Sequence, residues 1–178
     1  MDLFTAIKER QSCRQFKGGT VSRDDLEAIV EAARLAPSAV NGQPWMFHVV
    51  DEDPLKSLVA KALTQSFNRQ ASAFIVVEML PTKLPARVLG AVKKQPYAAI
   101  DIGIACAHLA LAATAKGYAS CLIGWFKEGT LKDVLGIPKT SRIHIVLSIG
   151  HAMHDTVREK KRKPFEKIAR FVNKDDVK

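Results

Sequence analysis

Cysteine and histidine are too few and too scattered in this 178-residue sequence to suggest a metal centre. The three cysteines, Cys13, Cys106 and Cys121, form no CxxC pair, and the five histidines lack HExxH spacing. We therefore expect no metal site and no disulfide framework. An odd number of cysteines without a secretory leader favours a reducing compartment, so we expect a cytoplasmic protein. Cys106 and Cys121 are expected to be buried.

Long hydrophobic runs and large aromatic residues are also scarce. Two Trp and two Tyr stand beside eight Phe, which predicts a mainly aliphatic core. The most apolar stretch, residues 98–115, is interrupted by Asp101 and His108, which favours a buried helix over a membrane span. Neither repeats nor a linker divide the chain, so residues 1–178 are expected to form one domain. Its last part, from about 155 to 178, is basic and then weakly apolar, which predicts that it packs on something, such as a second copy of the chain.

Acidic residues are outnumbered, with 18 Asp and Glu against 27 Lys and Arg, for a net charge of +9. Such an excess favours an anionic partner. Its densest part is REKKRK at 158–163, which fits a solvated tail, a nucleic-acid-binding patch or a phosphate clamp folded back onto the body. The run contains no aromatic residue that could stack on bases, which weakens the second interpretation. The run alone leaves all three open.

Hydrophobic periodicity predicts interspersed helices and strands. Helix caps are expected at Asp2, at Ser22 in a capping box with Asp25, and at Asp53 followed by Pro54. A further helix over 97–116 is apolar nearly all round, so deep burial is expected. Strands are predicted at 45–50, 73–79, 119–123 and 143–149.

Three polar stretches could carry chemistry. RQSCRQF at 10–16 sets arginines beside a hydroxyl, which suits a phosphate, although an exposed basic helix end gives the same pattern. The loop 37–45 carries Ser38, Asn41 and Gln43, which suit either a planar heterocycle or an Asx-type turn. Gly124 follows a strand, where it could let a ligand approach the backbone or simply serve a turn.

Taken together, these stretches resemble the nitroreductase family, the FMN-dependent NAD(P)H oxidoreductases. The matching motifs occur in the family's order and at its spacing from residue 4 to about 172. They are RQSCRQF, APSAVNGQPW at 36–45, IDIGIACAHLALAATAKGYASCLIGWF at 100–126, LGIP at 135–138, LSIGH at 147–151 and KKRKP at 160–164. Each motif is modest alone, and the ordered set is specific.

The resemblance implies an α+β fold with a mixed, mainly antiparallel sheet and helices on both faces. It also implies a homodimer with two FMN molecules at the interface and a C-terminal arm exchanged between subunits. The helix over 97–116 would pack across that interface. Residues implied at the cofactor are Arg10, Gln11, Ser12, Arg14, Pro37, Ser38, Asn41, Leu122, Ile123, Gly124, Trp125, Lys160 and Arg162.

These residues would divide the cofactor among them. The pair Lys160 and Arg162 would clamp the phosphate, with Arg10 and Ser12 at the phosphate and ribityl chain. The guanidinium of Arg14 would face the flavin N1–C2=O2 edge, and the backbone N–H groups of Gly124 and Trp125 would point toward N5 and O4. The group Pro37, Ser38 and Asn41 would reach the flavin bound mainly by the other subunit.

The implied activity passes a hydride from NADH or NADPH through flavin N5 to a nitroaromatic, a quinone or a similar small acceptor. No side-chain nucleophile or base is required, and neither a nucleic acid nor a membrane is expected as a partner. The sequence departs from the family pattern at Leu122, which would lie near the flavin. The family often places an amide or a lysine near residues 65–68 to contact the flavin ring, and Gln65 and Asn68 are only loose candidates for that contact. Two alternatives stay open: a nucleic-acid-binding module built on 158–163, and an FMN-binding redox protein without general nitroreductase activity. Residues 81–96, with three prolines and one glycine, are typical of a lid.

Overall fold

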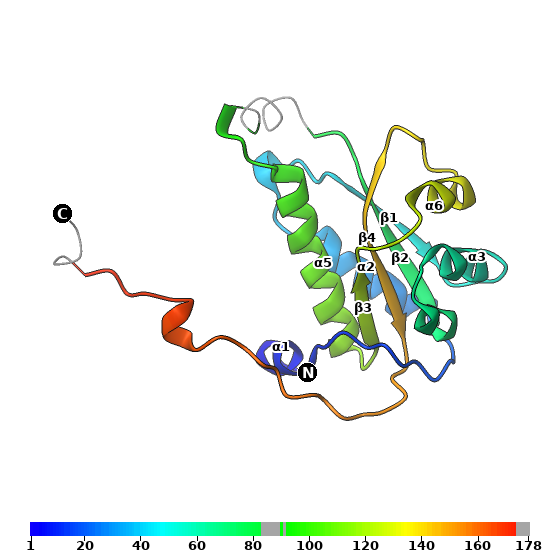
Figure 1. The fold of residues 1–178 in the computed structure, drawn as a ribbon, viewed down its shortest axis with the longest axis horizontal. Helices are drawn as coiled ribbons and strands as arrows, with labels where there is room; N and C mark the ends of the chain where they lie inside the picture. Colours follow the sequence, from blue (N-terminus) through cyan, green and yellow to red (C-terminus); the bar gives the residue numbers. More distant parts are fainter. Residues whose placement is uncertain (83–89, 91, 174–178) are drawn as a thin grey trace.

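Four strands form one antiparallel sheet in the order β1-β2-β4-β3 (Figure 1). The computed structural model describes residues 1–82, 90 and 92–173, so half of the lid expected within 81–96 lies outside the described residues. Most residues of β2 are apolar, many of them β-branched, and β2 pairs on both sides, as suits a strand inside the sheet. The strands are β1 Trp45–Val50, β2 Ala73–Met79, β3 Ala119–Ile123 and β4 Arg142–Gly150, in agreement with the predicted strands.

Helices cover both faces of this sheet (Figure 1). Because side chains alternate along a strand, Ile75 and Val77 face one core with α2 and α5, whereas Phe74 and Val76 face a second core with α3 and α6. This is the α+β arrangement that the family resemblance implied. The helices are α1 Leu3–Glu9, α2 Arg23–Arg34, α3 Leu55–Ala62, α5 Tyr97–Ala115 and α6 Glu128–Leu135, and 3-10 turns occupy Ala39–Asn41, Ser66–Gln70 and Phe165–Lys167.

Two of the three predicted caps are present; at the third, the N-cap is Pro54 rather than Asp53, whose carboxylate accepts from the Ser57 backbone N–H at 3.1 Å. Asp2 accepts from the backbone N–H of Thr5, and Ser22 accepts from that of Asp25. The second bond of the expected capping box, from the Ser22 backbone N–H to the Asp25 carboxylate, is not formed. The carboxylate of Asp25 instead accepts from the Tyr118 hydroxyl at 2.7 Å and pairs with the Lys116 ammonium at 2.9 Å. It thereby joins the start of α2 to the end of α5.

Helix α5 is buried on one face only, which corrects the expectation of deep burial all round. The buried face packs against α2 and the sheet, and it includes Ile102, Leu109 and the carboxylate of Asp101. The other face is open, and Ile100 on it is 45% exposed. By length and composition alone α5 could cross a membrane, and 39% of its apolar window is buried. In the single chain, the open face of this apolar helix is therefore not covered by any other element that the structure describes.

Candidate functional site

The N-terminal segment after α1 lies along the free edge of β3. The Cys13 amide donates to the Ser120 carbonyl at 2.8 Å, and Ser12 and Ser120 form an isolated parallel bridge. An edge strand presents unpaired N–H and C=O groups, so a neighbouring segment can attach there through its backbone. This attachment fixes residues 10–14 beside the end of the sheet.

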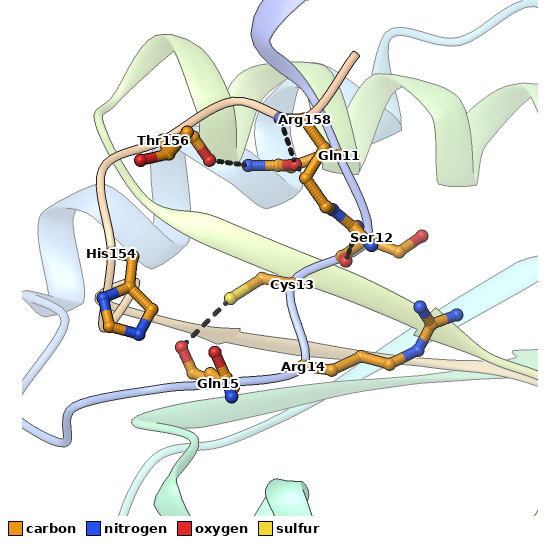
Figure 2. Close-up of a pocket in the computed structure, with 8 residues that line it drawn as sticks. All are labelled: Gln11, Ser12, Cys13, Arg14, Gln15, His154, Thr156 and Arg158. Atoms are coloured by element: carbon orange, nitrogen blue, oxygen red, sulfur yellow. Dashed lines mark hydrogen bonds between the residues drawn. The ribbon is translucent and has the colours of Figure 1, made fainter. Parts of the chain in front are cut away.

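The chain after β4 returns to the same segment (Figure 2). The Gln11 amide donates to the Thr156 carbonyl at 3.0 Å, and its oxygen accepts from the Arg158 backbone N–H at 3.1 Å. The Arg158 guanidinium donates to the Ser12 carbonyl at 2.7 Å. The Lys160 ammonium reaches the Lys8 carbonyl. Residues 156–160 are thus bound to the N-terminal segment by side chains.

These two segments enclose a strongly cationic cavity of about 350 Å³. It brings together all four residues expected at the phosphate, which lie far apart in the sequence. One carboxylate accompanies six cationic side chains, so an anion would be attracted there. The lining consists of Arg10, Gln11, Ser12, Arg14, Arg158, Glu159, Lys160, Lys161 and Arg162.

A second cavity of about 440 Å³ adjoins the first, and Gln11, Ser12, Arg14 and Arg158 line both. Figure 2 shows Cys13 and Gln15 on its wall beside His154, while the Arg14 side chain extends away from them. The Cys13 thiol faces the Gln15 carbonyl at 3.3 Å. The other two cysteines are buried as predicted, and burial raises the pKa of the Cys106 thiol to about 11. Among the described residues, no group of His, Cys, Asp or Glu could hold a metal ion.

The end of β3, the strand to which residues 10–14 are attached, offers an exposed surface. Leu122 is 39% exposed and Trp125 is 76% exposed, whereas the Ile123 side chain is buried in the core. Ile123 could therefore serve a ligand only through its backbone. The Gln65 amide donates to the Trp125 carbonyl at 3.2 Å, which keeps Gln65 at this surface.

Asn68, the other loose candidate for a ring contact, is a core residue. It is fully buried, its amide donates to the Gln65 carbonyl at 3.0 Å, and its oxygen accepts from the Ser148 hydroxyl at 2.7 Å. A side chain so placed cannot reach a ligand without unmaking these bonds. The structure therefore corrects this candidate to a structural role.

The loop after α2 lies away from both cavities. The Ala39 amide donates to both oxygens of Asp101, in the first turns of α5, at 3.1 and 3.2 Å. Within the loop, the hydroxyl of Ser38 accepts from the Gln43 backbone N–H at 3.0 Å, and the amide oxygen of Asn41 accepts from the Gln43 side chain at 2.9 Å. Neither of the two cavities above is lined by Pro37, Ser38 or Asn41. The structure thus separates these predicted residues from the cationic cavity.

The family model described as the Nitroreductase family matches residues 7–151. The chain belongs to the nitroreductase family. It is 34% identical over 155 residues to an Archaeoglobus fulgidus protein, with 82% of each chain covered. It is 29% identical over 191 residues to the oxygen-insensitive NADPH nitroreductase of Helicobacter acinonychis, with 89% of this chain and 90% of that protein covered.

Solved structures of nitroreductase-family proteins share the fold. A Clostridium novyi protein superimposes with a TM-score of 0.78 at 30% identity, with 89% of each chain covered. A protein of Exiguobacterium sibiricum, solved in complex with FMN, superimposes with a TM-score of 0.79 at 26% identity, with 97% of this chain and 98% of that chain covered. The α+β fold that the resemblance implied therefore has direct structural counterparts.

Two residues of this nitroreductase-family chain were missed as site residues. Arg158 opens the basic run and lines both cavities, but nothing in the sequence distinguishes it from the other cations of that run. Asp101 is the one acidic residue in an apolar helix, and it is 4% exposed. A buried carboxylate is rare without a partner, so its sequence context already indicated a specific bond.

Proposed function

We propose that this chain is an FMN-dependent oxidoreductase that draws electrons from NADH or NADPH. Membership of the nitroreductase family supports this proposal. So do the FMN complex of the Exiguobacterium sibiricum neighbour and the NADPH nitroreductase activity named for the Helicobacter acinonychis relative. When bound, the flavin supplies two-electron chemistry that a side chain cannot.

The cationic cavity carries this proposal. A phosphate monoester bears a charge between −1.5 and −2 at about pH 7. The guanidinium of Arg10, the hydroxyl of Ser12 and the cations of Lys160 and Arg162 line one cavity and suit such a group. The donor set therefore fits the phosphate end of FMN.

The remaining side chains would orient the ring. The guanidinium of Arg14 lines the same cavity, and a fixed cation there would stabilise negative charge at the flavin N1–C2=O2 edge. Leu122 and the backbone at Gly124 and Trp125 lie at the exposed end of β3, where they would meet the ring. Gln65, held against the Trp125 carbonyl, would border the same surface.

The acceptor is a nitroaromatic, a quinone or a similar small molecule. This part of the proposal rests on the names of the relatives and on an exposed surface at Leu122 and Trp125. A specialised FMN-binding redox protein without general nitroreductase activity is the second candidate, favoured by Leu122, which departs from the family pattern near the flavin. Nucleic-acid binding through 158–163 is disfavoured, because the run holds no aromatic residue that could stack on bases and because Arg158 bonds to the protein's own backbone.

We further propose one cytoplasmic domain that works as a homodimer. Exposed apolar side chains gather on α1, on the open face of α5 and on the C-terminal tail, which leaves the body in Figure 1. Monomers rarely expose such surface without a partner. A second copy would cover α5, which explains its apolar outer face without a membrane. The exposed residues include Leu3, Phe4, Ile7, Ile100, Phe165, Ile168 and Phe171.

An absorption spectrum of the purified protein tests the function. We expect a flavin spectrum that bleaches on anaerobic addition of NADH or NADPH and returns when a nitroaromatic or quinone is added. Bleaching without reoxidation by any acceptor would favour the specialised redox protein. A colourless protein that takes up no added FMN would refute the proposal. Salt-dependent DNA or RNA binding that survives Lys160→Ala with Arg162→Ala would point to the nucleic-acid alternative.

A further inference from the structure

Both the nitrogen and the oxygen of the Gln11 side-chain amide are hydrogen-bonded to the tail. The nitrogen donates to the Thr156 carbonyl at 3.0 Å, while the oxygen accepts from both the backbone N–H and the Nε of Arg158 at 3.1 Å each. These bonds leave the Gln11 oxygen with two donors already in place, which is its full ordinary capacity. A side chain so engaged binds the tail and has only one amide N–H left for a ligand.

Arg158 is turned toward the protein rather than toward the centre of the cavity. Its Nε donates to the Gln11 oxygen and its Nη2 donates to the Ser12 carbonyl at 2.7 Å. Both acceptors are neutral, so the positive charge of Arg158 is not cancelled while its geometry is fixed. Because Arg158 lines both adjoining cavities, it stands at the boundary between them.

Residues 153–163, the tail that carries Lys160 and Arg162, have few other contacts that order them. No helix or strand includes residues 153–163, and nearly all of their side chains are exposed. Besides the contacts of Gln11 and Ser12, the tail is held by a Met153 N–H bond to the Gln15 carbonyl and by the Lys160 contact with the Lys8 carbonyl. Lys160 lies two residues beyond Arg158, at most about 7 Å along an extended chain. Fixing Arg158 therefore restricts where Lys160 and Arg162 can go.

We propose that Gln11 and Arg158 form a latch that positions the phosphate-binding tail before the cofactor arrives. Here the latch means the bonds of Gln11 and Arg158 with each other and with the backbone of Thr156 and Ser12. The inference rests on the proposed FMN function, and it assigns Gln11 and Arg158 as positioning residues. Ordering a loop in advance removes an entropic cost from binding. The latch acts on the phosphate clamp, so it governs affinity for FMN but not for riboflavin, which lacks the phosphate.

The test compares flavin affinities of latch variants in the full-length protein. Gln11→Leu removes both ends of the latch at similar volume, and Arg158→Gln removes the guanidinium. We expect FMN to bind about tenfold more weakly to each, with riboflavin affinity within about twofold, since one or two net hydrogen bonds are lost. The double variant should bind FMN no more weakly than the weaker single variant, because both changes open one latch.

The matched control is Lys163→Gln, which removes one positive charge from the tail outside both cavities. Its FMN affinity should stay within about twofold of wild type. If Lys163→Gln weakens FMN as much as Arg158→Gln does, the effect is long-range charge and the latch is refuted. Equal losses for FMN and riboflavin would refute it too, because they would indicate general damage.

A second measurement needs no flavin. Trypsin cleaves after Lys and Arg, and the tail offers several such sites within 158–163. In the flavin-free protein, Gln11→Leu should speed cleavage in this run several-fold over wild type, because the latch no longer holds it. Unchanged cleavage would refute the latch. Wild-type protein that binds no FMN would refute the proposed function instead, while the cleavage result would still decide the latch.

Discussion

At the scale of single residues, Asp25 shows how one carboxylate joins separate elements. Hydrogen bonds from Lys116 and then Tyr118 lower the pKa of Asp25 to about 2, well below its usual value. The carboxylate lies at the start of α2, while its partners follow the end of α5. Ionised Asp25 therefore stabilises the fold at every pH above the ordinary carboxyl range.

Asp25→Asn should lower the melting temperature at neutral pH. The stabilisation is present above about pH 4 and is lost as the pH falls toward 2, because the folded-state pKa lies below the unfolded one. The difference between wild type and variant should accordingly shrink below pH 4, as followed by circular dichroism melts. Asp24→Asn, at the exposed neighbouring position, serves as control. A difference that stays constant down to pH 2 would contradict the assigned cause.

Individual side chains were the part of the site least accessible to sequence reasoning. The family resemblance implied that Arg10, Ser12, Arg14, Lys160 and Arg162 contact one cofactor, and in the structure all five line one cavity. It could not show that Gln11 is taken up by the tail, because that depends on a contact between segments far apart in sequence. For the same reason Asn68 looked available, although its neighbour Ser148 comes from β4.

At the scale of elements, the strands were predictable and the loop after α2 was not. The strands are short apolar runs bounded by turns, so local sequence defines them. The loop depends on distant support. Its backbone has positive φ at Val40, Asn41 and Gln43, a conformation that costs free energy for residues other than glycine. The bond from the Ala39 amide to Asp101 helps to hold it.

Asp101→Ala should loosen this loop and weaken FMN binding. Removing the carboxylate leaves the Ala39 N–H without its acceptor, which should cost about 1–3 kcal/mol of unfolding free energy. Asp101→Asn keeps an acceptor and should recover part of the FMN affinity. Urea unfolding and flavin titration would measure the two effects separately.

The control for this loop is Glu128→Ala. Glu128 also accepts a backbone N–H, from Ile143 at 2.9 Å, but at α6 on the opposite face of the sheet. The Glu128→Ala variant should lose a comparable unfolding free energy and keep its FMN affinity. Should Asp101→Ala and Glu128→Ala weaken FMN equally, Asp101 has no particular role in positioning the loop for the cofactor.

At the scale of the whole molecule, the two groups of predicted cofactor residues lie toward opposite ends of α5. The loop is bonded to Asp101 near its start, and the N-terminal segment is bonded to Ser120, just beyond its end. From Asp101 to Ala115, where α5 ends, the helix rises about 21 Å. That separation favours the proposal that Pro37, Ser38 and Asn41 serve the flavin of a second subunit.

Mixed dimers test this arrangement directly. One chain carries Lys160→Ala with Arg162→Ala, and the other carries Ser38→Ala with Asn41→Ala. If each site joins the clamp of one chain to the loop of the other, a mixed dimer has one fully intact site and one doubly damaged site. The mixed species, isolated with two different affinity tags, should therefore bind one FMN tightly, whereas both parent homodimers bind weakly. If clamp and loop act within one chain, both sites of the mixed dimer are damaged and its affinity stays as low as that of its parents.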